Sequence, residues 1–158
     1  MSTTLAERIP AVGDAAPDFS LPSTSGAEVS LSSLRGGLVL VAFFPLAFTS
    51  TCTQEVCGFS EDYDAFAGHG VTILPVSVDS VPTLKEFKAR YDLKVDFLSD
   101  FMREASRAYG VLIPSRNHSG RAYFLIDGEG IVRWAHVEQN PGARRENAEI
   151  LAEIAKLG

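Results

Sequence analysis

The two cysteines of this chain, Cys52 and Cys57, follow an apolar run that predicts a buried strand. The spacing from that run places Cys52 in the first turn of a helix. Unpaired backbone N–H groups and the positive end of the helix dipole converge there. Such surroundings lower the pKa of a thiol and produce a reactive thiolate. We therefore predict redox chemistry that begins at Cys52.

Three further residues have the types that assist a thiolate in cleaving an O–O bond. Pro45 ends the strand and shields the site, and Thr49 offers a hydroxyl that can donate and accept hydrogen bonds. Arg121 stands at the head of another apolar strand, where its guanidinium stays charged and offers two parallel donors. These groups suit peroxide cleavage, because the departing alkoxide or hydroxide must be stabilised as its charge develops.

The elements that position these residues follow from the hydrophobic pattern. The run 38–44 is apolar on both faces and predicts a central strand, and 51–66 predicts one helix with Thr51 and Gln54 as a capping box. Further predicted elements are a hairpin within 19–31, a strand at 71–78, a helix at about 83–91, an extended piece at 97–98, a helix at 103–109, strands at 122–126 and 131–135, and an amphipathic helix at 146–157. This order predicts an α/β domain with a mixed central sheet flanked by helices. We expect residues 1–158 to form one domain, with 1–10 as a loose leader.

Composition and charge exclude several classes of function. With 46% hydrophobic and 22% charged residues, the 158-residue chain is not predicted to be disordered. A net charge of −6 argues against general nucleic-acid binding. The sequence has neither a signal-peptide pattern nor an apolar run of membrane-spanning length, so we expect a cytoplasmic protein. Structural disulfides are rare in that compartment, which leaves catalysis, metal binding or simple packing for the two cysteines.

Alternative interpretations of single residues stay open. Free cysteines are often small buried hydrophobes, and Cys57 in particular could simply pack against the core. The histidines, His69, His118 and His136, show no spacing that favours a zinc site or a Cys–His hydrolase. Glu55 is interpreted as a charge that complements the helix N-terminus, not as a catalytic group.

The pattern Pro45-x-x-x-Thr49-x-x-Cys52 resembles the active-site signature of the peroxiredoxins, with Glu55 where that family has a glutamate one turn later. Further similar segments are 76–80, 97–100, 108–111 and Arg121 ahead of 124–127, so that the resemblance covers about residues 11–157. The resemblance implies a thioredoxin-like fold with an N-terminal hairpin. It also implies thiol-dependent reduction of hydrogen peroxide, organic hydroperoxides or peroxynitrite through a sulfenic acid on Cys52, with no metal or organic cofactor.

The two cysteines relate the chain to two subgroups of that family. The sequence of residues 44–49 is similar to that of the one-cysteine alkyl hydroperoxide reductase E type, whereas the C-x4-C spacing resembles the bacterioferritin-comigratory, or Q-type, members. In the latter the second cysteine, here Cys57, can resolve the sulfenic acid. Residues five apart on an ideal helix have Cα atoms roughly 8–9 Å apart, beyond the ~7 Å limit for a disulfide. The first turns must therefore unwind before Cys52 and Cys57 can bond. A one-cysteine enzyme with a structural Cys57 remains the alternative.

The resemblance also implies partners. A thioredoxin- or glutaredoxin-like dithiol protein would be the reductant. A homodimer that uses the aromatic edge near Phe48 is one expectation, and a monomer is the alternative, because the family contains both. No cysteine follows Cys57, so we expect no resolution by a cysteine in a C-terminal extension. An alternative from a different class of function is a redox sensor or binding protein that is switched by oxidation of Cys52. Turnover distinguishes it from an enzyme. A sensor reacts once and then binds a partner, whereas an enzyme cycles with a reductant.

Overall fold

The computed structural model describes residues 8–140 and 143–157. In chain order its elements are β1 (Ser20–Pro22), β2 (Glu28–Ser30), the 3-10 helix η2 (Leu31–Leu34), β3 (Leu38–Phe43), α1 (Ser50–Glu61), α2 (Tyr63–Gly68), β4 (Val71–Ser77), α3 (Val81–Arg90), β5 (Leu98–Ser99), α4 (Glu104–Ala108), β6 (Leu112–Ile113), β7 (His118–Ser119), β8 (Ala122–Ile126), β9 (Val132–Val137) and α5 (Asn147–Ala155). Residues 1–7, the greater part of the predicted leader, lie outside the described residues, so the leader remains a prediction.

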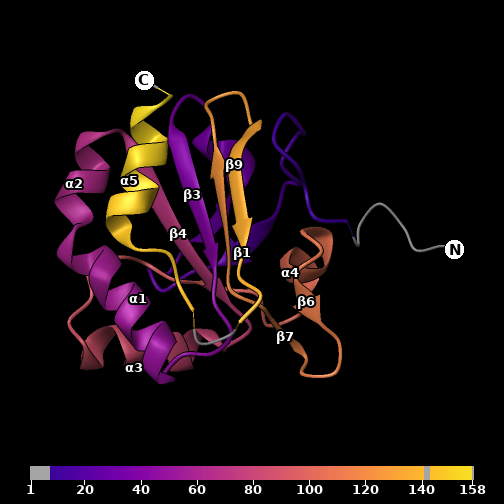
Figure 1. Cartoon of the computed structure of the whole chain (residues 1–158). Helices are drawn as coiled ribbons and strands as arrows, with labels where there is room; N and C mark the ends of the chain where they lie inside the picture. Colours follow the sequence, from indigo (N-terminus) through magenta and orange to yellow (C-terminus); the bar gives the residue numbers. More distant parts are fainter. Residues whose placement is uncertain (1–7, 141–142, 158) are drawn as a thin grey trace, which may run out of the picture.

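The main sheet has the strand order β5-β4-β3-β8-β9, with β3 at its centre (Figure 1). Strand β3 pairs parallel to β4 and antiparallel to β8, and β9 returns antiparallel to β8. The prediction of a mixed sheet with 38–44 as its central strand is confirmed, as are the N-terminal hairpin β1–β2 and the hairpin β8–β9. The C-terminal ends of β3, β4 and β5 and the start of β8 thus meet at one edge of the sheet.

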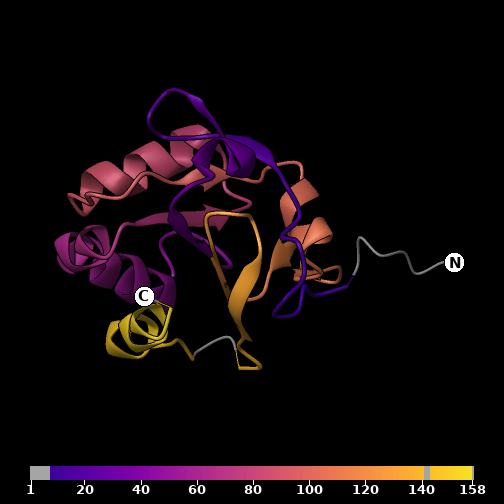
Figure 2. The same cartoon turned by 90° about the horizontal axis from the view of Figure 1, so that it is seen from above.

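Two hydrophobic clusters cover the two faces of this sheet, which explains why the central strands are apolar on both sides. Successive residues of a strand point to opposite faces. In β3, Leu40 and Ala42 enter the cluster beneath α1, α2, α3 and α5, whereas Val39 and Val41 enter the cluster beneath the N-terminal hairpin and α4. Figure 2 shows these two groups of elements on opposite sides of the sheet. The fully buried strand pair β3–β8 therefore forms a rigid base for the residues at its ends.

The prediction of one helix over 51–66 was wrong in two respects. The chain bends at Asp62, which ends α1 and precedes α2, and this bend brings the rings of Phe59 and Phe66 into edge contact, with centroids 5.9 Å apart. The predicted capping box is also not formed, because Thr49 occupies the N-cap position and makes no side-chain capping bond. Packing of both aromatic rings into the same core outweighs the continuity of the helix.

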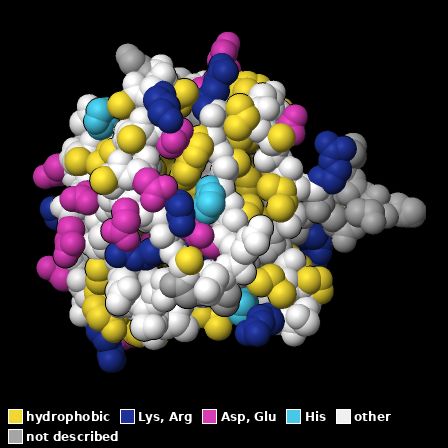
Figure 3. Space-filling view, in the orientation of Figure 1, with side chains coloured by type: hydrophobic (Ala, Val, Ile, Leu, Met, Phe, Trp, Pro, Cys, Tyr) yellow, Lys and Arg dark blue, Asp and Glu magenta, His cyan; other side chains and the backbone are white. Residues whose placement is uncertain are grey.

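Two short elements had no counterpart in the prediction. The 3-10 helix η2 follows β2 directly, and strands β6 and β7 form a separate two-stranded hairpin next to α4. Figure 3 shows acidic side chains gathered over the helical side of the molecule, which fits the net negative charge. No helix within residues 8–140 and 143–157 is long and apolar enough to span a membrane.

Candidate active site

The sheet topology explains how Cys52 and Arg121 come together although 69 residues separate them. Strand β3 ends at Phe43, which pairs with Ala122, the first residue of β8. The chain after β3 and the chain before β8 therefore occupy the same edge of the sheet. Cys52 follows β3 as the third residue of α1, and Arg121 immediately precedes β8. The predicted placement of Cys52 in the first helical turn is confirmed.

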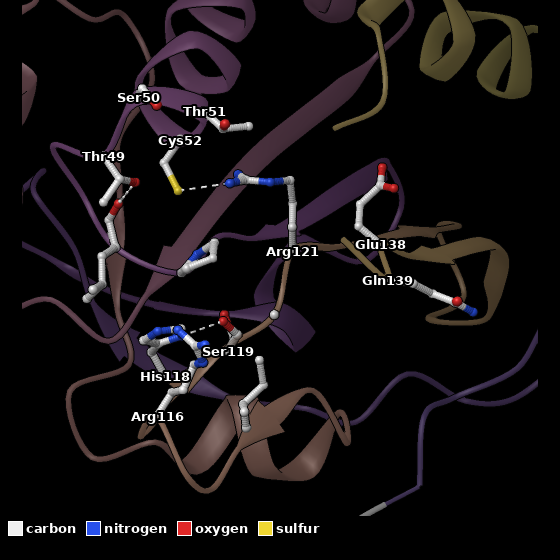
Figure 4. Close-up of a pocket in the computed structure, with 14 residues that line it drawn as sticks. Thr49, Ser50, Thr51, Cys52, Arg116, His118, Ser119, Arg121, Glu138 and Gln139 are labelled. Carbon is white, nitrogen blue, oxygen red and sulfur yellow. Dashed lines mark hydrogen bonds between the residues drawn. The ribbon is translucent and has the colours of Figure 1, made fainter. Parts of the chain in front are cut away.

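The thiol of Cys52 lies in direct contact with the guanidinium of Arg121. Nη2 of Arg121 donates to Sγ of Cys52 at 3.1 Å, and the two side chains point at one another in Figure 4. Only 1% of Cys52 is exposed. The buried setting weakens the screening of this positive charge by water, so the guanidinium acts strongly on the groups that it contacts.

Glu55 occupies the other side of the same guanidinium. Nη1 of Arg121 donates to Oε1 of Glu55 at 2.6 Å, and both side chains are almost fully buried. Burial raises the pKa of the Glu55 carboxyl, while the adjacent guanidinium acts in the opposite direction. Burial also opposes the charge on Arg121, yet Glu55 and Cys52 together raise the pKa of its guanidinium. The interpretation of Glu55 as a charge for the helix terminus was wrong, because its carboxylate instead holds Arg121 against Cys52.

Thr49 and Pro45 lie where the sequence predicts, beside the thiol. The hydroxyl of Thr49 donates to the carbonyl oxygen of Leu46 at 2.8 Å. With its proton used in this way, the hydroxyl oxygen presents lone pairs and is set to accept a hydrogen bond in the pocket. The sequence predicted a hydroxyl that can donate and accept hydrogen bonds, and in the structure its proton is used within the loop. Pro45 follows β3 and lines the same pocket.

A pocket of about 460 Å³ opens over Cys52. Its wall combines residues from the loop after β3, the first turn of α1, the β6–β7 hairpin and the segment after β9: Pro45, Leu46, Thr49, Ser50, Thr51, Cys52, Ile113, Arg116, His118, Ser119, Gly120, Arg121, Glu138 and Gln139. Sequence reasoning found Pro45, Thr49, Cys52 and Arg121 but missed the wall formed by β6–β7. The residues of that hairpin carry no periodic pattern, and only the tertiary fold brings them to the thiol.

Cys57 lies on the same helix in a different setting. It is half-buried, packs against the core beneath α1 and is a free thiol, as is Cys52. Burial and the nearby Glu61 carboxylate raise the pKa of the Cys57 thiol. Since α1 is continuous from Ser50 to Glu61, the two cysteines are held at helical spacing. The helix must open before these sulfur atoms can meet.

The histidines contribute little to the thiol's immediate surroundings. His118 lines the pocket, and its Nδ1 lies 2.8 Å from the carbonyl oxygen of Ser119, which fixes the ring at the mouth. His136 lies on β9 and stacks on Trp134. Among the described residues no group of three or more His, Cys, Asp or Glu side chains is arranged to hold a metal ion.

Comparisons with known proteins agree with this geometry. A sequence model of the AhpC/TSA family matches residues 12–135. The chain is 38% identical over 128 residues to a protein named putative peroxiredoxin bcp from Coxiella burnetii, covering 77% of this chain and 84% of that protein. It is 35% identical to peroxiredoxin Bcp of Escherichia coli K12, covering 75% of this chain and 80% of that one. Among solved structures, the reduced 2-Cys peroxiredoxin of Plasmodium vivax superimposes with a TM-score of 0.86 at 34% identity, over 92% of this chain and 81% of its own. The predicted thioredoxin-like fold is confirmed.

Proposed function

The chain belongs to the AhpC/TSA family and is a peroxiredoxin, a thiol-dependent peroxidase, and on this basis we propose that Cys52 is its peroxidatic nucleophile. The observation that carries the assignment is the hydrogen bond from Arg121 to the buried Sγ of Cys52 at the base of the pocket. Burial and the nearby Glu61 carboxylate raise the pKa of the Cys57 thiol, which supports assigning the first step to Cys52.

The first step divides the chemistry among the residues around the pocket. The Cys52 thiolate attacks one oxygen of the hydroperoxide, an S–O bond forms, and the O–O bond breaks. The departing oxygen takes the electron pair of that bond and a proton, and it leaves as an alcohol or as water. Arg121 stabilises both the thiolate and the developing negative charge, and the Thr49 hydroxyl oxygen accepts a hydrogen bond from the peroxide O–H. Pro45 restricts access of bulk water, and Cys52 is left as a sulfenic acid.

We propose that Cys57 resolves this sulfenic acid. Its thiolate attacks the Cys52 sulfur, an S–S bond forms, and the hydroxyl of the sulfenic acid leaves with a proton as water. The first turns of α1 must unwind for this step, which is feasible because helix ends open locally at low cost. A thioredoxin- or glutaredoxin-like dithiol then reduces the disulfide and returns both thiols. The presence of a second cysteine on the same helix supports this two-cysteine cycle, and a one-cysteine cycle with a structural Cys57 is the alternative.

The pocket volume supports substrates larger than hydrogen peroxide. About 460 Å³ with an apolar contribution from Leu46 and Ile113 accommodates an organic hydroperoxide. The proposed substrates are therefore hydrogen peroxide and organic hydroperoxides. The site as proposed uses the side chains of this chain and needs no metal or organic cofactor.

Assembly and location remain part of the proposal. Leu46, Phe48 and Tyr91 are 36%, 41% and 40% exposed, and the rings of Phe48 and Tyr91 lie 6.3 Å apart at the active-site edge. These residues are the aromatic edge on which we propose a second copy of the chain to pack, as a homodimer. Sedimentation of wild type and of Phe48→Ser tests it: a monomeric wild type contradicts a dimer.

A cytoplasmic location is likewise proposed, and fractionation of cells that express the chain tests it.

Stopped-flow mixing with hydrogen peroxide tests the proposed nucleophile. Cys52→Ser is expected to lose peroxide reduction, whereas Cys57→Ser is expected to retain the first step. Intact-mass analysis after one equivalent of peroxide tests the resolution: wild type should lose two hydrogens and both free thiols. A Cys52→Ser protein that consumes peroxide at the wild-type rate overturns the assignment of Cys52. A stable sulfenic acid in wild type overturns the role of Cys57.

A further inference from the structure

Asp79 connects the end of β4 to the loop that carries the nucleophile. Its Oδ2 accepts a hydrogen bond from the backbone N–H of Ala47 at 2.8 Å, across 32 residues of sequence. Ala47 is buried and lies in the loop between β3 and α1, five residues before Cys52. Strands β3 and β4 run side by side, and α1 and α3 begin beyond their lower ends (Figure 1). The carboxylate thus joins two neighbouring loops at the active-site edge.

Asp79 is itself held in place by two buried serines, one bonded to its carboxylate and one to its backbone. The hydroxyl of Ser77 donates to the same Oδ2 at 2.7 Å, and it also accepts from the Asp79 N–H at 3.2 Å. The hydroxyl of Ser99, on β5, donates to the carbonyl oxygen of Asp79 at 2.6 Å. Ser77 and Ser99 are almost fully buried. Asp79 is therefore a preorganised acceptor anchored to β4 and β5, not a surface carboxylate that happens to lie near Ala47.

The loop that Asp79 holds contains a strained residue. Phe48 adopts a φ of +69°, in the left-handed region that a bulky side chain rarely occupies. Such a conformation persists only where the surrounding structure holds it. The next residue, Thr49, is the N-cap of α1 and bonds back to Leu46. A fixed Ala47 on one side and the helix on the other keep this turn in its strained form.

We propose that Asp79 is a positioning residue for the peroxidase reaction, acting through the backbone of Ala47. The inference rests on the proposed function of Cys52. Arg121 comes from β8, whereas Thr49 and Cys52 come from the loop and helix after β3. Besides the ion pair between Arg121 and Glu55, the distance between guanidinium and thiol therefore depends on how firmly that loop is held to the sheet. The Asp79–Ala47 bond supplies this connection on the β4 side.

The same bond opposes the unwinding that Cys57 requires. Opening the first turn of α1 moves the preceding loop, and a loop tied at Ala47 opens less readily. Removal of the Asp79 carboxylate thus has opposite effects on the two steps. It slows attack on peroxide, because Cys52 and Arg121 lose their fixed separation, and it speeds formation of the Cys52–Cys57 disulfide.

Three variants separate this role from ordinary structural support. Asp79→Ala removes the acceptor, whereas Asp79→Asn keeps an oxygen that can accept from Ala47. Ser80→Ala removes the N-cap of α3, whose hydroxyl accepts from Thr83 N–H at 3.3 Å, and leaves the bond to Ala47 intact. It is the matched control for loss of stability at the same turn. The measurements are the rate constants of sulfenic acid formation and of disulfide formation, followed by stopped flow and rapid-quench mass analysis with hydrogen peroxide.

Asp79→Ala is expected to lower the first rate constant about tenfold, since small displacements of reacting groups cost up to about a hundredfold, and to raise the second. In Asp79→Asn both rate constants are expected to stay within about threefold of wild type, because a neutral acceptor replaces a charged one. Ser80→Ala should leave the first rate constant unchanged. A wild-type first step in Asp79→Ala, or an equal loss in Ser80→Ala, overturns the proposal. If Asp79→Ala does not fold, Ser77→Ala replaces it, and an unchanged first step there overturns the proposal. A wild-type protein inert toward peroxide instead refutes the proposed function.

Discussion

Cys52 and Cys57 stand on one helix, yet their surroundings differ in almost every respect. Cys52 is buried at the base of a pocket and accepts a hydrogen bond from Arg121, whose other nitrogen is held by Glu55. Cys57 is half-buried against the core, and burial together with Glu61 raises its pKa. The same side chain is thus bonded to a buried cation at one position and packed beside a carboxylate at the other, about 1.4 turns away.

The difference shows where the reactivity of this protein originates. The helix dipole acts as a partial charge within the first turn of α1, where Cys52 lies and Cys57 does not. A full charge comes from Arg121, which the pairing of β3 with β8 delivers to only one of the two thiols. Under the proposed function, Cys52 reacts first and Cys57 acts only after the helix opens.

Loss of Arg121 should remove most of the difference in reactivity toward peroxide between the two cysteines. Arg121→Met is expected to slow sulfenic acid formation about a thousandfold, because it removes the group that stabilises both thiolate and leaving oxygen. It should also lower the free energy of unfolding by roughly 3–5 kcal/mol, since Glu55 is left buried without its counter-charge. Stopped-flow kinetics and urea denaturation measure the two effects.

The double variant Arg121→Met, Glu55→Met is the control for folding. Replacing both partners of a buried ion pair by apolar residues is often neutral for stability, so the double variant should recover stability but not the rate. An Arg121→Met protein that forms the sulfenic acid within about threefold of the wild-type rate would contradict a role of the Arg121 cation in the first step.

Glu55→Gln should reduce the difference in reactivity between Cys52 and Cys57 less than Arg121→Met does. The amide oxygen can still accept from Arg121, but the charge that holds the guanidinium is lost. We expect the first step to slow about tenfold, which corresponds to the loss of a charge-assisted hydrogen bond. The measurement is again the stopped-flow rate constant with hydrogen peroxide. A surface control, Glu61→Gln, should leave this first step at the wild-type rate, and equal losses in both variants would contradict a specific role for Glu55.

The second step should depend on pH through Cys57. A raised pKa means that the folded protein holds Cys57 as the thiol at neutral pH, so disulfide formation should speed up as pH rises toward that pKa. The free energy of unfolding changes in the opposite direction. The contribution of Cys57 to it is complete below the pKa of the unfolded thiol and is lost as pH rises through the pKa of the folded thiol. Glu61→Gln should lower the Cys57 pKa and speed disulfide formation about twofold at neutral pH, as expected for one exposed charge. Rapid-quench mass analysis across the pH range measures both. A disulfide rate that does not change with pH would mean that unwinding, not the thiol, limits resolution.

Cys57→Ser should produce the smallest change in the first step. Because Cys57 takes no part in binding Arg121 or the peroxide, the rate constant of sulfenic acid formation should stay within about twofold of wild type. The sulfenic acid should then persist, detectable by dimedone labelling, until an external thiol reduces it. A large loss in the first step would contradict the separation of the two roles.

The sequence predicted the parts of this site that depend on local pattern. The two-faced apolar run before Pro45 marked β3, and its distance from Cys52 placed the thiol in the first turn of α1. Arg121 was found because it precedes an equally apolar strand. The ion pair with Glu55 was not found, because a pairing across 66 residues depends on how β3 and β8 pack and not on local pattern.

Other features escaped prediction for related physical reasons. The break at Asp62 depends on packing of Phe59 against Phe66, and the β6–β7 hairpin has strands of two residues, too short to show alternation. The bond from Asp79 to Ala47 joins two loops whose proximity only the sheet order creates. Local pattern thus singled out Cys52 as the proposed nucleophile, whereas the contacts that position its thiol arise from tertiary structure.

The most direct test of the account identifies which thiol peroxide oxidises first. Wild-type protein is mixed at pH 7 with less than one equivalent of hydrogen peroxide in the presence of dimedone, and the labelled sulfur is located by fragmentation of the peptide that carries both cysteines. The account predicts dimedone on Cys52 and none on Cys57 in the first turnover. Label on Cys57, or equal label on both, would contradict the claim that Arg121 and the pocket make Cys52 the nucleophile.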